Sequence, residues 1–264
     1  MTLPSVLPAA PDAPNALFEY LLRLGDDRLV LGHRLSEWCG HGPILEEDIA
    51  LANVALDLLG QATMFLHLAG EVEGKGRDED ALAYFREAIE FRNCQMVELP
   101  KGDFGLTIVR QFLFDAFAVV TLDALSRSSH ADLAAIAAKA LKEAKYHIRH
   151  SSEWVLKLGD GTEESHVRAQ RALDELWRFT PELFAMDDID RALRANGVSA
   201  DLDACHATWD TVVRDVVSRA TLVLPDATPK RTMRNGRNGA HSEHLGLLLA
   251  EMQIVARSHP GAKW

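Results

Sequence analysis

The sequence lacks several features that would assign a protein quickly. Its three cysteines, Cys39, Cys94 and Cys205, are far apart, odd in number and without a CxxC motif. This pattern is typical of buried thiols in a reducing compartment, not of a disulfide framework or a zinc site. There is no glycine-rich phosphate loop, Rossmann fingerprint or Ser-His-Asp order. The motifs therefore indicate no nucleotide, flavin or nicotinamide site.

Positive charge and long apolar runs are also scarce. The formal net charge is -11, and phosphate binding requires a clustered cationic surface, so we exclude nucleic acid as a partner. No uninterrupted apolar run reaches the roughly 18–20 residues that span a bilayer. Residues 1–14 contain four prolines and no basic segment, which predicts a loose leader and not a signal peptide. We expect a cytoplasmic protein with no membrane segment.

Helical periodicity dominates what the sequence does have, and strand-like alternation is almost absent. With 47% hydrophobic residues and no repeat or linker, we expect one all-α domain over 1–264, a helical bundle with extra peripheral helices. Asn15 is a plausible N-cap of the first helix. The short CGHGP connection predicts that the first two helices form an antiparallel hairpin. The predicted helices cover about 15–38, 44–69, 80–99, 106–127, 131–158, 163–179, 201–223 and 242–257.

Polar residues recur on the apolar faces of four of these helices. Acids there are costly unless they are paired or bound to a metal. The distribution matches a di-iron carboxylate bundle, in which two helices supply one Glu each and two supply Glu-x-x-His. The residues concerned are Glu37, Asp57 with Gln61, Asp115, and Glu143 with His147.

The identities of these residues do not fit that plan. Leu58 lies three residues before Gln61, and Ala144 lies three residues before His147, where carboxylates should bridge the irons. Both positions expected to hold a bridging acid thus carry apolar residues, and one position expected to hold histidine carries glutamine. Two irons would keep too much uncompensated charge.

An i, i+4 pairing of Asp57 with Gln61 and of Glu143 with His147 recovers some ligands. Such pairs are also ordinary intrahelical hydrogen bonds. Three interpretations stay open: a working metal site, a polar network in a former site, or unrelated structural polar residues. In the second, Lys145 would help to neutralise the buried acids.

Three further polar stretches have weaker signals. His241 and His244 flank Glu243, but residues of one turn do not converge on a metal, so a capping or interface role is favoured. The basic stretch 230–237 suits a solvated loop or partner segment better than an anion site. Residues 90–93 lie within a predicted helix. Their polar side chains form either a ligand-binding face or a solvated face of that helix. The tryptophans are expected in the core or an interface.

Several stretches together resemble the C subunit of bacterial phenylacetyl-CoA ring 1,2-epoxidase. They are LGDDRLVLGHRLSEWCGHGP, ALANVALDLLGQA, KEAKYHIRHSSEW, LWRFTPELF, HSEHLGLLLAEMQ and PGAKW, and they cover the chain from about Leu24 to Trp264. The resemblance implies a ferritin-like fold within a multicomponent monooxygenase that inserts one atom of O2 into the ring of phenylacetyl-CoA. It also implies partners: a homologous A subunit with the di-iron centre, and a flavin and iron-sulfur reductase that uses NADPH.

In this resemblance the C subunit has lost iron ligands and serves as a structural partner of A, with no catalytic residue or cofactor of its own. The degenerate ligand positions implied here are Glu37, Leu58, Gln61, Asp115, Ala144 and His147. Coenzyme A contacts are expected at Glu90, Phe91, Arg92, Asn93 and Arg191. Two alternatives are an independent di-iron oxidase or oxygenase that uses Glu37, Asp57, Asp115, Glu143 and His147, and a metal-free helical interaction protein.

Overall fold

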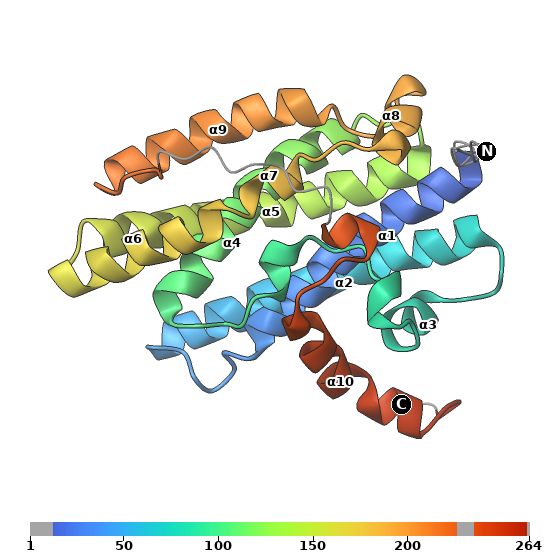
Figure 1. The fold of residues 1–264 in the computed structure, drawn as a ribbon, viewed down its shortest axis with the longest axis horizontal. Helices are drawn as coiled ribbons and strands as arrows, with labels where there is room; N and C mark the ends of the chain where they lie inside the picture. Colours follow the sequence, from blue (N-terminus) through green and yellow to red (C-terminus); the bar gives the residue numbers. More distant parts are fainter. Residues whose placement is uncertain (1–12, 226–234, 263–264) are drawn as a thin grey trace, which may run out of the picture.

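The computed structural model describes residues 13–225 and 235–262, and within these it contains helices and no β-strand (Figure 1). The all-α prediction is confirmed. The longer helices are α1 (Ala13–Ser36), α2 (Leu45–Glu73), α4 (Phe104–Leu125), α5 (Ala131–Gly159), α6 (Glu163–Trp177), α9 (Leu202–Arg219) and α10 (Glu243–Ser258). The short ones are α3 (Glu79–Tyr84), α7 (Thr180–Leu183) and α8 (Asp188–Ala195), with 3-10 turns η1 (Ala88–Glu90), η2 (Gln95–Glu98) and η3 (Gly236–Asn238).

The helices α1 and α2 form the predicted antiparallel hairpin. A Cβ added at Gly25 would lie 2.8 Å from the side chain of Leu66, and one added at Gly32 would lie 3.1 Å from that of Leu59. The partner numbers fall as the glycine numbers rise, which is the register of antiparallel helices. The two glycines let the helix axes approach closely, and this fixes which α1 residues face α2.

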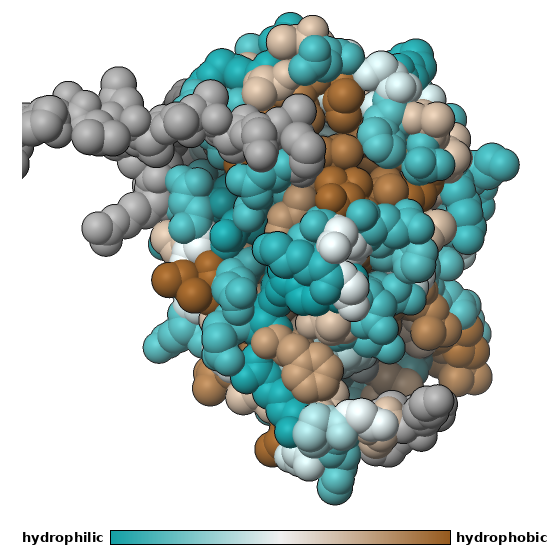
Figure 2. Space-filling model, turned by 90° about the vertical axis from the view of Figure 1, so that its right-hand side faces the viewer, coloured by the Kyte–Doolittle hydropathy of each residue, from teal (hydrophilic) through white to brown (hydrophobic). Residues whose placement is uncertain are grey.

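The second half of the bundle is built on α4, which packs against α5, α6 and α9. Two helices, α2 and α4, are long and apolar enough to cross a membrane by length and composition alone. The apolar composition of α4 is explained by its burial, because a helix that is apolar on all sides suits the centre of a bundle. The bundle end seen in Figure 2 is mostly hydrophilic, with separate apolar patches.

The predicted helix over 80–99 is wrong. Only α3 is helical there, and the chain continues through η1 and η2 in a largely extended path. Acids of α1 hold this path: the backbone N–H of Arg92 donates to Asp26 at 2.8 Å and that of Cys94 donates to Asp27 at 2.7 Å. These side chains satisfy N–H groups that a helix would otherwise pair internally. Tertiary contacts therefore override the local helical pattern.

Other expectations also need correction. Helix α1 begins before Asn15, which therefore does not cap it, and the stretch 180–200, for which no helix was predicted, contains α7 and α8. Cys94 and Cys205 are buried free thiols, whereas Cys39 is exposed because it follows the end of α1. The expected leader, apart from its last two residues, and most of the basic stretch 230–237 lie outside the described residues.

Candidate functional site

A chain of hydrogen bonds links α1, α2 and α5 at the position where a di-iron bundle carries its metal. Arg28 on α1 donates through Nε to Oε1 of Gln61 at 2.9 Å. The Nε2 group of Gln61 then donates to Oε2 of Glu143 on α5 at 2.8 Å. Arg28 also stacks over Phe65, and burial lowers its pKa to about 10. The guanidinium of Arg28 is thus connected to the carboxylate of Glu143 through the amide of Gln61.

Two histidine–carboxylate pairs continue the seam between α2 and α5. Nε2 of His147 lies 3.0 Å from Oδ2 of Asp57, and Nε2 of His150 lies 2.8 Å from Oε2 of Glu47. His147 is buried, while Asp57 reaches solvent with 40% of its side chain exposed. These are cross-helix pairs, so the i, i+4 pairings considered from the sequence do not form.

Asp115 on α4 is buried beside this seam. Its Oδ1 accepts from Nε2 of Gln111 at 2.7 Å, and its Oδ2 accepts from Oγ of Ser151 at 2.8 Å. Burial raises the pKa of Asp115 to about 6, while the nearby His147 and these hydrogen bonds oppose the rise. The Oε1 atom of Gln111 is buried without a partner. This carboxyl is therefore held by neutral donors and lacks a cation in direct contact.

The residues at this position do not fit a di-iron centre. Leu58 and Ala144 are buried hydrocarbon side chains, each 2% exposed, where the bridging carboxylates would be required. Gln61 uses both its oxygen and its nitrogen in bonds to protein groups. Among the described residues, no group of three His, Cys, Asp or Glu side chains is placed to hold a metal ion. We derive no chemical step through iron in this chain.

Glu37, one of the expected ligand positions, lies away from this cluster. It follows the end of α1 and pairs with Arg34 at 2.6 Å. It is nine residues beyond Arg28, about 14 Å along a helix. Of the remaining polar positions, Asp115 lies near His147, and Gln61 bonds to Glu143 one turn before His147 on α5.

Three members of the cluster were not predicted from the sequence. Lys145 was expected to neutralise the acids, but its side chain is exposed, and the cation bonded into the cluster is Arg28, through Gln61. A signal for Arg28 existed, since it ends the charged triplet of residues 26–28 within a mostly apolar helix. Gln111 and Ser151 could have been found as residues one helical turn from Asp115 and His147.

A second polar cluster ties two distant segments to α1. Asp27 accepts hydrogen bonds from both terminal nitrogens of Arg237, at 2.9 and 2.7 Å, and both side chains are buried. Asp26 is paired with Arg86 in the same way, with one contact at 3.0 Å. The segment after α3 and the segment before α10 therefore both rest on two adjacent acids of α1.

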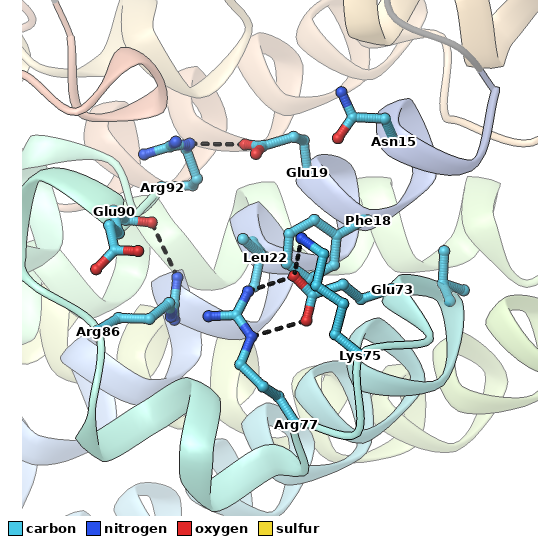
Figure 3. A pocket seen from close by; sticks show the side chains of 11 residues that line it. Asn15, Phe18, Glu19, Leu22, Glu73, Lys75, Arg77, Arg86, Glu90 and Arg92 are labelled. Atoms are coloured by element: carbon cyan, nitrogen blue, oxygen red, sulfur yellow. Dashed lines mark hydrogen bonds and ion pairs between the residues drawn. The ribbon is translucent and has the colours of Figure 1, made fainter.

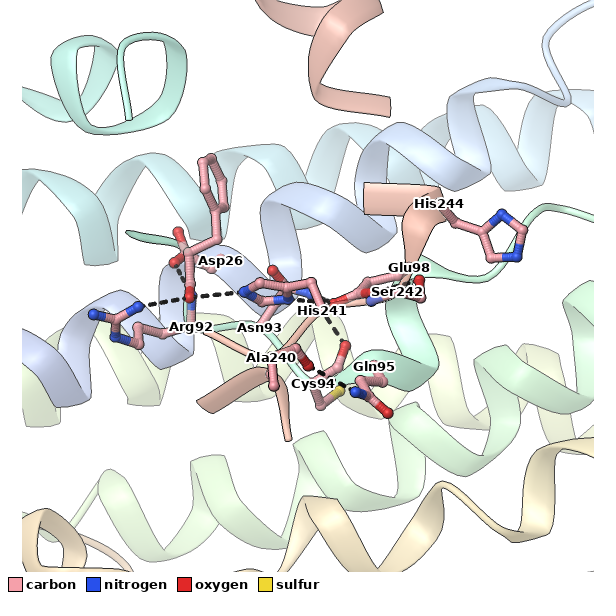
Figure 4. Close-up of polar contacts among 12 residues, drawn as sticks. Asp26, Arg92, Asn93, Cys94, Gln95, Glu98, Ala240, His241, Ser242 and His244 are labelled. Carbon is pink, nitrogen blue, oxygen red and sulfur yellow. Dashed lines mark hydrogen bonds and ion pairs between the residues drawn. The ribbon is translucent and has the colours of Figure 1, made fainter. Parts of the chain in front are cut away.

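Glu98 organises the neighbouring part of this cluster (Figure 4). Its carboxylate binds Nδ1 of His241 at 2.5 Å and accepts from both the backbone N–H and the hydroxyl of Ser242. Nε2 of His241 lies 3.0 Å from the carbonyl of Phe91. The ring of His244 points away from this group in Figure 4. His241 and His244 therefore do not converge on a metal ion.

The four residues expected to contact coenzyme A after α3 have different environments. Phe91 and Asn93 are fully buried. The guanidinium of Arg86 lies over the Phe91 ring at 4.3 Å, and Asn93 donates to Glu98 at 3.0 Å. Both are structural in this arrangement.

Glu90 and Arg92 line a cavity of about 400 Å³ between the start of α1 and the end of α2 (Figure 3). Arg92 pairs with Glu19 at 2.7 Å, and Arg77 and Lys75 both pair with Glu73. Each of these three cations of the cavity thus already has a carboxylate partner. A role in substrate binding stays a prediction.

Arg191 does not line this cavity. It lies on the exposed side of α8, where its guanidinium pairs with Asp188 at 2.7 Å. The helix itself is anchored to α1 through Arg23, which contacts Asp190 at 2.8 Å. Arg191 therefore does not share the cavity that Glu90 and Arg92 line.

The fold and the cluster define a class: an all-α, ferritin-like bundle whose central polar positions are bonded to one another. The comparison with protein families agrees. Residues 6–264 match the family described as phenylacetic acid catabolic protein, and the chain belongs to this family. It is also 49% identical over 250 residues to the C subunit of 1,2-phenylacetyl-CoA epoxidase from Escherichia coli. The alignment covers 95% of this chain and 100% of that relative.

Proposed function

We propose that this chain is a non-catalytic subunit of a phenylacetyl-CoA epoxidase complex. In this proposal it pairs with a homologous A subunit that carries the di-iron centre, and a reductase supplies the electrons. Support comes from the full-length similarity to the C subunit of an epoxidase. The network of Arg28, Gln61 and Glu143 carries the non-catalytic part of the proposal, because protein groups occupy the bonds that metal ligation would need.

Charge balance supports the non-catalytic assignment. A di-iron centre brings several positive charges, which four acids offset in a working site. Here apolar residues, Leu58 and Ala144, stand at two positions where acids are required, and Arg28 is bonded to Gln61, which in turn bonds to Glu143. A metal-free bundle can then keep its geometry without loading a cofactor. A fixed bundle surface is what a structural partner of an active subunit requires.

The experiment is to purify the chain alone and together with the A subunit. Iron analysis of the chain alone should give far less than one iron per chain, and the A subunit should lose solubility or epoxidation activity without it. About two irons per chain would overturn the non-catalytic assignment and favour the independent oxidase. Full activity of A alone would remove the structural role.

A further inference from the structure

The outer side of α2 is uncovered, and it carries exposed apolar residues together with the uncharged polar residues Asn53 and Thr63. Between Asp48 and Glu71 its only acid is Asp57, which is bonded to His147. On the same side, a Cβ added at Gly60 would meet no atom within 4 Å. Several large apolar side chains exposed on one side of a helix are a feature of interaction sites. Its large apolar side chains, between 50% and 72% exposed, are Ile44, Leu45, Ile49 and Leu56.

The adjoining side of α5 is basic, although the protein as a whole is acidic. Lys139, Lys142 and Arg149 are exposed and recur at helical spacing beside the half-exposed Tyr146. Within the described part of the chain, neither lysine takes part in an ion pair, and Arg149 approaches Glu153 only to 3.8 Å. These cations are therefore available to a partner.

The outer side of α2 and the basic side of α5, called here the α2 stripe and the α5 stripe, form one continuous face. The bonds from Glu47 to His150 and from Gln61 to Glu143 hold α2 and α5 side by side, so their outer sides lie next to each other. Two adjacent helices are about 20 Å wide, and some 20 residues of each are about 30 Å long. The face is therefore roughly 600 Å², close to the ~800 Å² that one partner buries in a stable interface.

A second copy of this chain does not suit the face. Two-fold symmetry would place the basic stripe of α5 against its own copy or against the uncharged stripe of α2. The first arrangement brings like charges together, and the second removes unpaired charges from water. A different chain with an apolar helical surface bordered by carboxylates would cover the apolar residues of α2 and pair with the cations of α5.

We propose that the face formed by α2 and α5 is the docking surface for the A subunit, through an apolar helical surface with an acidic border. This inference rests on the proposed function, since it names where the pairing occurs. Apolar residues of α2 supply the centre of the interface, and Lys139, Lys142 and Arg149 supply its basic edge.

The test measures the affinity of purified A subunit for the full-length chain. Leu56→Glu should weaken binding roughly 30-fold or more, as expected for a central apolar contact. Lys142→Glu should weaken it less, by about 3- to 10-fold, and should reduce its dependence on salt. The matched controls are Val167→Glu, an exposed apolar residue of α6, and Arg219→Glu, an exposed cation of α9. Both should bind like the wild type.

The outcomes separate this inference from the proposed function. If wild-type chain does not bind the A subunit, the proposed function fails and the docking surface with it. If the wild type binds and Leu56→Glu binds within about twofold of it, only the docking surface is wrong. A wild-type homodimer that Leu56→Glu converts to a monomer would also overturn the choice of partner. Circular dichroism and the Tm verify that the exposed substitution leaves the fold intact.

Discussion

Replacing Asp115 by asparagine should stabilise the protein near neutral pH and leave it unchanged in acid. Burial raises the pKa of Asp115 from 3.8 to about 6. The folded protein therefore holds this proton more tightly than the unfolded chain does. The stability that the proton contributes is present below pH 3.8 and is lost as the pH rises through 6. Asparagine does not titrate in this range, so its stability shows no such loss.

The pKa shift gives the size of the effect. A rise of roughly two pKa units corresponds to about 3 kcal/mol of unfolding free energy at pH 7. The hydrogen bonds need not be lost. The asparagine oxygen can accept from Ser151, and its amide can donate to the unpartnered Oε1 of Gln111 once that side chain turns over. The difference between Asp115→Asn and wild type should thus rise from about zero at pH 4 to about 3 kcal/mol at pH 7.

Urea unfolding at intervals from pH 4 to pH 8 measures this difference directly. Asp203→Asn, at an exposed position of α9, is the control and should show no comparable rise between pH 5 and 8. A difference for Asp115→Asn that stays flat from pH 4 to 7 would refute the argument that burial governs this carboxyl. A loss of stability at pH 7 would show that its ionised form is needed, as in a site that holds a cation.

Three further predictions concern the two clusters and a carboxylate on α7. Glu182 of α7 accepts hydrogen bonds from the backbone N–H groups of Gln95, at 2.9 Å, and Gly236, at 2.7 Å. Glu182→Ala should lower stability by about 2–4 kcal/mol, as measured by urea unfolding, because these partly buried N–H groups would lose their partner. Arg237→Met should cost about 3–5 kcal/mol, since Asp27 would remain as a buried unpaired acid, and Asp27→Leu in the same chain should recover part of the loss. Iron binding, measured by metal analysis and absorption, should appear in the triple variant Leu58→Glu, Gln61→His and Ala144→Glu.

Each of these has a clear contrary result. Glu175→Ala, at an exposed position of α6, is the control for the Glu182 variant, and equal effects of the two would remove the argument from buried N–H groups. If Arg237→Met and the double variant were equally destabilised, the charge of Asp27 would not be the cause. A triple variant that folds and takes up no iron would show that the ligand positions are aligned incorrectly.

The central cluster was partly predictable because helical spacing is a local property. Counting back from Gln61 and His147 placed Leu58 and Ala144 on the inner faces of α2 and α5, and both are buried there. The partners were not predictable. The bond from Arg28 to Gln61, which in turn bonds to Glu143, depends on how closely α1 and α2 pack and on their register. Lys145, on α5, is exposed.

The sequence by itself determined the helical class, the main helices and the hairpin of α1 and α2, because the periodicity of apolar residues and the turn residues act over a few positions. It also determined that the apolar residues Leu58 and Ala144 stand three positions before Gln61 and His147. Only the tertiary structure decided the path of 85–99, where Asp26 and Asp27 of α1 take backbone N–H groups out of a helix. It alone also placed Arg237 on Asp27 and left one side of α2 uncovered. These depend on groups far apart in the chain, whose pairing no local pattern encodes.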